Sequence, residues 1–366
     1  MAKGFLIGDI HLGAHSLQMD RWLNIMEDYF YNFLTPILKE QYQKGDKLFI
    51  LGDLFDNRTY LELKVISKSL DIFNFLENLD IDLDIVIIGG NHDYYNDHDS
   101  ANTSLRILEK HSNIEIHKEP FVYEIGTKKI LLLPWIHPHT KQLEIIKEHT
   151  GKVDYLFCHS DLRGAKTGIK NVLKSGPTVA DFVGYPKVYA SHIHLYQTME
   201  NFTFLGSPYH LDRNDKGNKK GLTILDIETG EDIFIPNNLS PEFKTITITE
   251  ESDIEHLDRL IKIDGVIEEK DNFIDLHINN SLIINKPEIR KKLEMVSKRK
   301  RISVKQFDDI LIEDTVENID LDDIGNDISV EDMIRTYVNN QQFDDILKEK
   351  IDELLEDAIK ICKSDG

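Results

Sequence analysis

The first half of the chain alternates short apolar runs with longer stretches of helical periodicity, and this alternation constrains the fold more than any other feature. Six apolar runs are predicted to be buried strands: Gly4–Gly8, Lys47–Leu51, Ile85–Ile88, Ile130–Leu133, Tyr155–Cys158 and Val188–Ala190. Two long helices are predicted at Leu17–Gln43, bent at Pro36, and at Tyr60–Leu79, where Leu63, Ile66, Leu70, Phe73 and Leu76 share one face. This order predicts an α/β sandwich with largely parallel central strands, followed from Val188 to Pro236 by short antiparallel strands.

Polar motifs follow the predicted strands directly. These motifs are Asp9-Ile10-His11, Gly52-Asp53-Leu54-Phe55-Asp56, Gly90-Asn91-His92-Asp93, His159, and His192-Ile193-His194. Because loops at the carboxyl ends of strands in an open α/β sheet converge on one site, we expect these side chains to meet. Each motif alone has little specificity, but five of them in order, each at the end of an apolar run, indicate a functional site.

The residue types in these motifs suit divalent transition metals. Carboxylate oxygens, imidazole nitrogens and an amide oxygen form a donor set that favours Mn²⁺, Fe²⁺ or Zn²⁺ over Ca²⁺. A carboxylate with two free oxygens can bridge two such ions, which can then neutralise a phosphodiester and lower the pKa of water.

With these motifs, the sequence resembles the calcineurin-like metallophosphoesterases. The motifs at 52–56 and 90–93, with Gly206-Ser207-Pro208, are most similar to the Mre-eleven/SbcD DNA-repair nucleases, and within them to the phage recombination endonuclease subunit. The resemblance implies a metallophosphoesterase β-sandwich flanked by helices, with a small α+β cap domain and a C-terminal helix pair. Ser191 stands where the family has a glycine before the last histidine motif.

The resemblance also implies roles for individual residues and two divalent ions, Mn²⁺ above all, with Mg²⁺ as the alternative. Asp9, His11 and His194 would hold the first metal, Asp53 would bridge, and Asn91, His159 and His192 would hold the second. His92 would stabilise the scissile phosphate or protonate the leaving 3′ oxygen, and Asp56 would orient His92 by hydrogen bonding. His137 and His139 have ligand spacing too, but they are surplus to this set and a structural or surface role is favoured.

The family's activity implies a 3′-to-5′ exonuclease and endonuclease that acts on DNA in recombination and double-strand-break repair with an SbcC-type, SMC-like ATPase. Two other functions fit the same fold. A phosphoprotein phosphatase or small-molecule phosphodiesterase would share the metal core, and a non-catalytic scaffold would keep the fold and bind the ATPase.

Charge is distributed unevenly along the chain, which changes what the net charge implies about nucleic-acid binding. A net charge of -22 argues, taken alone, against a nucleic-acid binder. However, residues 307–366 contain 19 acidic and 5 basic residues, whereas residues 286–305 contain nine basic and two acidic ones. The basic segment is either a solvated helix face that balances the acidic tail or, as resemblance to a family whose cap domain binds DNA implies, a contact with the DNA backbone through Arg290, Lys291, Arg299 and Arg301. Lys216, Lys219 and Lys220 follow the Gly206-Ser207-Pro208 loop and are further candidates.

Composition changes along the chain predict four segments. They are the nuclease domain (1–238), the cap domain (239–306), an acidic linker (307–328) and a helix pair (329–366). By resemblance, the helix pair would bind the ATPase, and the helices at 17–43 and 60–79 would form a homodimer. Two distant cysteines exclude a disulfide framework, and no apolar stretch is long enough to span a membrane, so we expect a cytoplasmic protein of a bacterium or a phage-infected cell.

Overall fold

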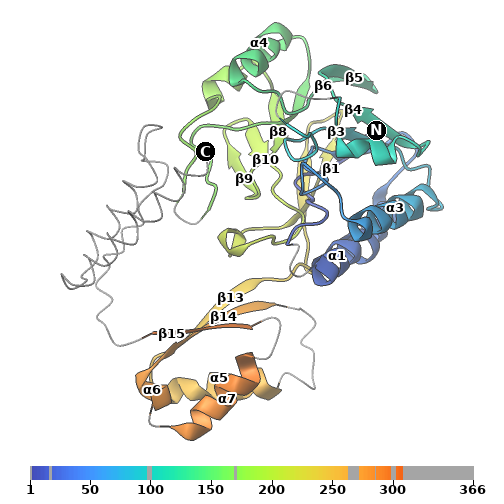
Figure 1. Ribbon diagram of the computed structural model, residues 1–366. Helices are drawn as coiled ribbons and strands as arrows, with labels where there is room; N and C mark the ends of the chain where they lie inside the picture. Colours follow the sequence, from blue (N-terminus) through green and yellow to red (C-terminus); the bar gives the residue numbers. More distant parts are fainter. Residues whose placement is uncertain are drawn as a thin grey trace, which may run out of the picture. The chain divides into compact units, whose positions relative to one another are not determined.

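The computed structural model describes residues 2–15, 19–96, 101–168, 171–262, 272–284, 286–297 and 302–307 (Figure 1). The described residues all belong to one compact unit, residues 1–308. The acidic linker and the helix pair expected near the C-terminus fall outside the described residues. Among the helices that are described, none has the length and apolar composition needed to cross a membrane.

Two six-stranded sheets form the main part of this unit. The first sheet contains, in spatial order, β12 (Asp232–Pro236), β11 (Gly221–Asp226), β1 (Lys3–Ile7), β2 (Lys47–Ile50), β3 (Ile85–Ile88) and β4 (Ile114–His117). The second contains β5 (Phe121–Ile125), β6 (Lys128–Leu133), β7 (Tyr155–His159), β8 (Lys187–Ser191), β10 (Phe202–Phe204) and β9 (Gln197–Met199). All six strands predicted from the apolar runs are present, within about two residues of the predicted ends.

The pairing directions agree with the sequence in the centre of each sheet. Strands β1 to β4 are parallel to one another, and so are β6, β7 and β8. The antiparallel strands expected after Val188 are β9, β11 and β12, but β8 and β10 pair in parallel, so that expectation was only partly correct.

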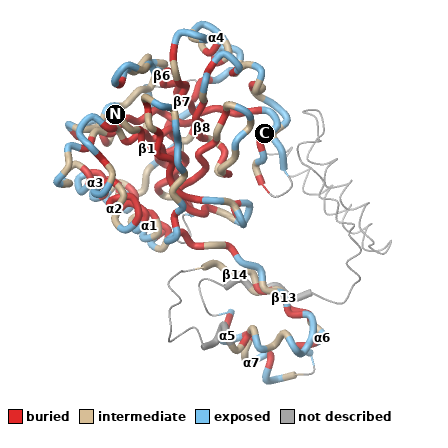
Figure 2. Tube along the Cα trace, turned by 180° about the vertical axis from the view of Figure 1, so that it is seen from behind, coloured by how far each residue is buried: buried red, intermediate tan, exposed pale blue. Residues whose placement is uncertain are grey.

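The central strands are buried on both faces, which explains why they read as continuous apolar runs. Alternate residues of β1 and β2 point to opposite sides: Leu48 and Ile50 pack under the helices, whereas Leu6 and Phe49 pack between the two sheets. The inner face of the second sheet contributes Phe157 to this same layer, and the Phe49 and Phe157 rings meet edge to face at 5.0 Å. This shared core fixes one sheet against the other. Figure 2 shows the burial along β1, β7 and β8.

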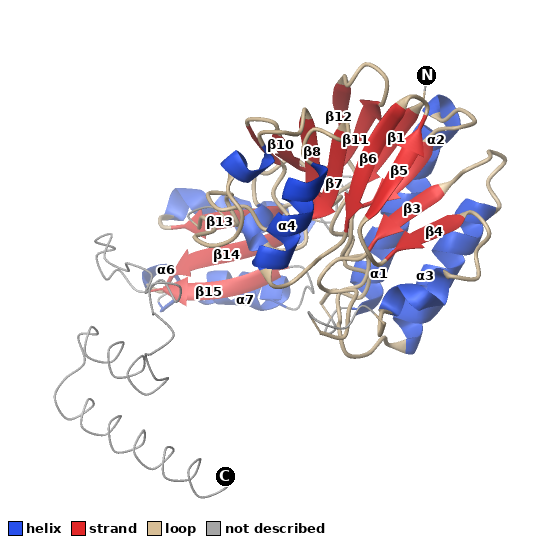
Figure 3. Ribbon diagram, turned by 90° about the horizontal axis from the view of Figure 1, so that it is seen from above, coloured by secondary structure: helices blue, strands red, loops and turns tan. Residues whose placement is uncertain are grey.

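Helices cover the two outer faces (Figures 1 and 3). The first sheet is covered by α1 (Met19–Asp28), a π-helix (Tyr29–Leu34), α2 (Thr35–Gln41) and α3 (Leu63–Glu77). The second is covered by α4 (His139–His149) and a 3₁₀ turn (Val179–Phe182). Further 3₁₀ turns are Ser104–Leu108 and Arg213–Asp215. The single helix expected at 17–43 is thus divided by a π-helical segment, and Pro36 lies in the first turn of α2.

The buried face of α3 differs from the predicted one. Val65, Ser69, Ile72, Phe73 and Leu76 are its buried residues, whereas Leu63 is 84% exposed. Leu63 is the first residue of the helix and directly follows a loop, so helical spacing alone did not predict its exposure.

A smaller three-stranded sheet follows in the same unit. It contains β13 (Phe243–Ile248), β14 (Phe273–Asn279) and β15 (Ile302–Phe307), all parallel, with a 3₁₀ turn (Glu251–Ile254), α5 (Glu255–Lys262), α6 (Ser281–Ile284) and α7 (Pro287–Ser297). It has a hydrophobic core of its own, in which Ile248, Leu276 and Val296 are fully buried. Such a core is what the predicted cap domain requires, although its boundaries at 239 and 306 stay a prediction.

Two leucines of α3 provide a test of the corrected helix face. Replacing Leu76, which is 1% exposed, by Ala is expected to lower the free energy of unfolding by about 2–5 kcal/mol, because it leaves a cavity under the first sheet. Replacing Leu63 by Ala is expected to change it by less than about 0.5 kcal/mol. Urea unfolding followed by circular dichroism measures both changes. Equal losses of unfolding free energy in the two variants would show that Leu63 is buried, as predicted from the sequence.

Candidate metal centre

The polar side chains predicted from the strand ends meet at one edge of the two sheets. Asp9 and His11 follow β1, Asp53 follows β2, Asn91 and His92 follow β3, His159 ends β7, and His192 and His194 follow β8. Two hydrogen bonds join the sheets at this edge. The His192 amide donates to Asp9 Oδ1 at 2.8 Å, and His159 Nδ1 lies 2.9 Å from the Leu51 carbonyl oxygen.

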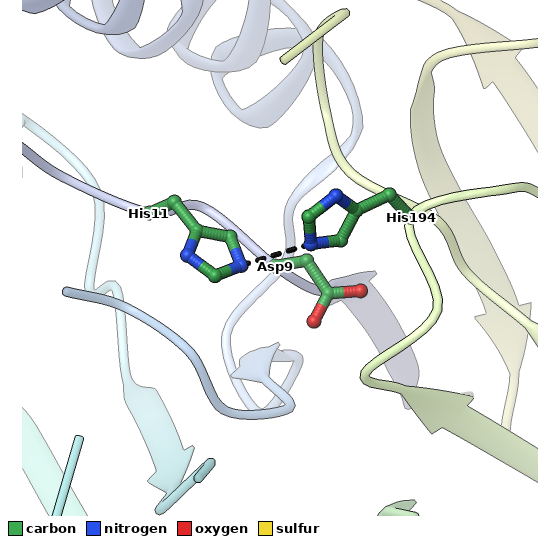
Figure 4. A group of neighbouring side chains, drawn as sticks. All are labelled: Asp9, His11 and His194. Atoms are coloured by element: carbon green, nitrogen blue, oxygen red, sulfur yellow. Dashed lines mark hydrogen bonds between the residues drawn. The ribbon is translucent and has the colours of Figure 1, made fainter. Parts of the chain in front are cut away.

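One group contains Asp9, His11 and His194 (Figure 4). Their ligand atoms lie within 4.8 Å of one another. The Nε2 atoms of the two imidazoles face each other at 3.0 Å, and Asp9 Oδ2 is buried with no hydrogen-bond partner among the described residues. An unsatisfied carboxylate oxygen beside two inward ring nitrogens has the donor chemistry of a cation site.

A second group contains Asp53, His159 and His192. Asp53 Oδ2 lies 3.3 Å from His159 Nε2 and 3.6 Å from His11 Nε2, so this carboxylate stands between the two groups. Asn91 Oδ1 joins the second group at 2.9 Å from His159 Nε2 and 2.8 Å from His192 Nδ1.

The candidate ligand atoms of the second group point toward one another. The Leu51 carbonyl accepts from His159 Nδ1, so in the neutral ring Nε2 carries the lone pair and faces Asn91 Oδ1. Turning the Asn91 amide around would direct its nitrogen to the imidazoles and its oxygen to Arg58. With the oxygen inward, a cation satisfies all of these acceptors together, and the residues therefore fit divalent metals.

The local electrostatics also favour positive charge. Burial lowers the pKa of His11, but the hydrogen bond to Asp56 and the charges of Asp53 and Asp9 outweigh it and raise that pKa to about 9. The pKa of His159 is likewise raised to about 9 against burial, chiefly by Asp53. Burial also opposes ionisation of Asp53, yet its imidazole neighbours hold its pKa well below the usual range. This carboxylate is therefore ionised.

His92 is hydrogen-bonded to the main chain of Asp56. Its Nδ1 lies 2.6 Å from the main-chain carbonyl oxygen of Asp56, which fixes the Nδ1 proton and leaves Nε2 as the free ring nitrogen. The Asp56 carboxylate instead lies 3.1 Å from His11 Nδ1. Asp56 therefore contacts both histidines, one through its backbone and one through its side chain, and the His11 and His92 rings lie 4.8 Å apart.

Strained backbone is concentrated at this edge. Asp9, His11, Asp53 and His192 all have positive φ, between 48° and 101°, a conformation that costs of order 1–3 kcal/mol for such residues. Gly90 is required for close packing, since a Cβ there would lie 2.2 Å from the Asp53 amide nitrogen. Ser191 is accommodated in the family's glycine position because Gly8 opposite it has no side chain: a Cβ at Gly8 would lie 1.8 Å from Ser191 Oγ.

Some supporting residues were not identified from the sequence. Asp93 is buried and accepts hydrogen bonds from the amides of Gly90 at 2.9 Å and Phe55 at 3.1 Å, so it ties the loop after β3 to the loop after β2. Burial and the charge of Asp53 raise its pKa to about 7. The Gly-Asn-His-Asp motif at 90–93 contains Asp93 and was the sequence signal from which it could have been identified.

Asp161 was not identified from the sequence at all. His139, for which a structural or surface role was predicted, lies against it.

The basic residues proposed for DNA have different environments. Lys216 and Lys219 are exposed, and Lys216 donates to Thr245 Oγ1. Arg290 and Lys291 are exposed on α7, whereas Arg299 and Arg301 lie outside the described residues.

Lys220 is only 3% exposed, which contradicts a contact with DNA. Its ammonium donates to the His194 carbonyl oxygen at 2.6 Å, to Ser207 Oγ at 2.8 Å and to Asp215 Oδ1 at 2.6 Å. Lys220 therefore supports the loop that carries His194.

Comparison with known proteins agrees with this geometry. The sequence profile of the calcineurin-like phosphoesterases matches residues 5–204. The chain belongs to the calcineurin-like phosphoesterase family. The family inferred from the motifs is thereby confirmed, and members of this family use divalent metals. The predicted mixed α/β fold, with two sheets flanked by helices, is confirmed as well.

Individual relatives are more distant. Exonuclease subunit 1 of Enterobacteria phage T4 is 27% identical over 238 residues, which are 63% of this chain and 67% of the phage protein. Among solved structures, an archaeal phosphodiesterase covers 64% of this chain and 99% of its own, with 13% identity and a TM-score of 0.31. The calcineurin-like phosphoesterase YfkN from Bacillus subtilis covers 64% of this chain and 88% of its own, with 12% identity and a TM-score of 0.34.

The two adjacent lysines allow a matched test of the burial of Lys220. Replacing Lys220 by Ala leaves the Asp215 carboxylate buried without its cation, and we expect a loss of about 3–5 kcal/mol in the free energy of unfolding. Replacing the exposed Lys219 by Ala is expected to change it by less than about 0.5 kcal/mol. Chemical denaturation of both variants measures the difference, and a Lys220→Ala protein as stable as the parent would contradict the buried ion pair.

Proposed function

We propose that this chain is a metal-dependent nuclease that hydrolyses phosphodiester bonds of DNA, as a 3′-to-5′ exonuclease and an endonuclease, in recombination and double-strand-break repair. The observation that carries the proposal is the meeting of seven metal-ligand candidates from both sheets with His92 beside them. The 27% identity to a phage exonuclease subunit supports a nucleic-acid substrate over other phosphoesters.

In this proposal the ligands divide into two sites. Asp9, His11 and His194 would hold one divalent ion, Asn91, His159 and His192 would hold the other, and Asp53, which stands between the two groups, would be a ligand of both. We propose Mn²⁺ for both, with Mg²⁺ as the alternative, because mixed oxygen and imidazole donors suit Mn²⁺ well. When bound, such ions supply Lewis-acid chemistry: they lower the pKa of water and neutralise a phosphodiester.

His92 acts on the substrate in this mechanism. The Asp56 carbonyl oxygen holds Nδ1, so the ring presents Nε2 to the scissile phosphate. Protonated there, His92 stabilises the phosphate and donates its proton to the leaving 3′ oxygen. Asp56 holds the orientation of His92 through its backbone and that of His11 through its carboxylate.

The first test is the effect of His92→Ala on two substrates. Full-length protein with Mn²⁺ is given linear duplex DNA and, separately, bis-p-nitrophenyl phosphate. Loss of the general acid is expected to lower turnover of DNA by about 10²–10⁴-fold. Mn²⁺ binding, measured by calorimetry, is expected to be unchanged because His92 is outside the ligand set.

The matched control is His149→Ala, at the opposite end of α4 from His139, which is expected to keep full activity. Strong turnover of the small phosphoester without DNA cleavage would favour a phosphatase or small-molecule phosphodiesterase. No turnover of either substrate, with the ATPase partner present, would favour a non-catalytic scaffold.

We further propose the assembly in which the nuclease works. An SbcC-type, SMC-like ATPase binds the C-terminal helix pair, and the segments at 17–43 and 60–79 pair two copies of the chain. DNA contacts the exposed Lys216, Lys219, Arg290 and Lys291. The reaction takes place in the cytoplasm of a bacterium or of a phage-infected cell.

Deleting residues 329–366 tests the partner assignment. The deletion is expected to abolish co-purification with the ATPase, since it removes a predicted helix with apolar residues at positions 343, 346/347, 351, 354/355, 358 and 361. Mn²⁺ binding is expected to be retained, because no proposed ligand lies in this segment. A truncated protein that still co-purified with the ATPase would show that the partner binds elsewhere.

A further inference from the structure

A chain of polar contacts leads away from the candidate metal centre on the side of α4. His139, the first residue of this helix, lies with Nε2 3.0 Å from Asp161 Oδ2. The other oxygen of the same carboxylate, Oδ1, lies 2.9 Å from His192 Nε2. Asp161 is thus held between two imidazoles, and both of its oxygens are engaged.

His192 connects this chain to the centre. Its Nδ1 lies 2.8 Å from Asn91 Oδ1, so the ring offers one nitrogen to the ligand group and the opposite nitrogen to Asp161. The Trp135 ring stacks on it at 4.9 Å with an interplanar angle of 26°. The orientation of His192 is therefore fixed by stacking on its face and by Asp161 at its outer edge.

We propose that Asp161 is a positioning residue that holds His192 in the tautomer needed to bind metal through Nδ1, and that His139 keeps the Asp161 carboxylate out of the metal's ligand set. The inference rests on the proposed metal-dependent function and adds two residues that the predicted ligand set did not include.

The role of Asp161 follows from the chemistry of imidazole. A carboxylate can only accept at this position, so His192 donates Nε2–H and keeps its lone pair on Nδ1. Metal-binding histidines commonly donate their second ring N–H to such a partner, and removing the partner weakens metal affinity by about 10–100-fold. The opposite tautomer would place a proton where the ion binds.

The role of His139 follows from the position of Asp161. This carboxylate lies two residues after the ligand candidate His159 and against the ligand candidate His192, so it is itself an available oxygen donor. The contact of His139 Nε2 with Oδ2 at 3.0 Å occupies that oxygen and holds the side chain on the outer side of His192. Without His139, the freed oxygen would move the donor set toward the all-oxygen chemistry that Mg²⁺ prefers.

The test compares metal binding by full-length variants, independently of activity. Mn²⁺ and Mg²⁺ are titrated by calorimetry into the parent, Asp161→Ala, Asp161→Asn, His139→Ala and His139→Gln proteins, with His149→Ala on the same helix as the control. Thermal melting of each apo-protein establishes that it is folded, and Asp161→Asn keeps the size of the side chain if Asp161→Ala does not fold.

We expect Asp161→Ala and Asp161→Asn to lose about 10–100-fold in Mn²⁺ affinity at one of two sites and to leave the other unchanged. His139→Ala is expected to raise the affinity for Mg²⁺ relative to Mn²⁺, and His139→Gln, which can still donate to Asp161, to restore the parent's preference. Parent-like Mn²⁺ affinity at both sites in folded Asp161 variants would overturn the positioning role.

An unchanged Mg²⁺ to Mn²⁺ preference in His139→Ala would overturn the role of His139. A parent protein that binds neither ion would instead overturn the metal-dependent function on which the inference rests, so the two failures are distinguishable.

Discussion

The packing of the two sheets against each other is the constraint on which the candidate site depends. The proposed ligands come from β1, β2 and β3 in one sheet and from β7 and β8 in the other, so no single sheet contains a complete set. The layer containing Phe49 and Phe157 sets the spacing of the sheets. The hydrogen bond from the His192 amide to Asp9 then joins the two sheets at the site, between residues that are 183 positions apart in the sequence. A substitution in the core between the sheets would therefore change the relative positions of the proposed ligands.

The same edge accumulates interactions that oppose folding in the absence of cations. Four proposed ligands have left-handed backbone, and one carboxylate oxygen of Asp9 is buried without a hydrogen-bond partner among the described residues. These features cost free energy that the hydrophobic layers must offset. Divalent ions would remove much of the cost by satisfying the acceptors, which couples metal binding to stability. Such a concentration of unfavourable local structure in an otherwise well-packed sandwich is typical of a functional site.

Much of the fold and the convergence of nine candidate site residues could be predicted from the sequence because both depend on local order along the chain. Strands buried on both faces appear as apolar runs, and the parallel arrangement brings their carboxyl ends together. The supporting residues could not be predicted in this way. Asp161 acts through His139 and His192, and Lys220 acts through Asp215 and the His194 carbonyl, so their roles depend on which segments become neighbours. Asp56 shows a further limit: its contact with His92 was expected, but only the structure distinguishes its backbone carbonyl from its carboxylate.

The environment of Lys220 also changes how the charge of the protein should be interpreted. Its ammonium is paired with Asp215 inside the protein, so it cannot contribute to a surface that attracts DNA. On α7, Lys292 is paired with Asp258, which leaves Arg290 and Lys291 as the exposed cations of that helix. Lys220 and Lys292 are therefore not available to replace counterions on a phosphate backbone, and the chain as a whole has a net charge of -22. If DNA is the substrate, its binding must depend less on general electrostatic attraction than on direct contact between the scissile phosphate and the site at the sheet edge.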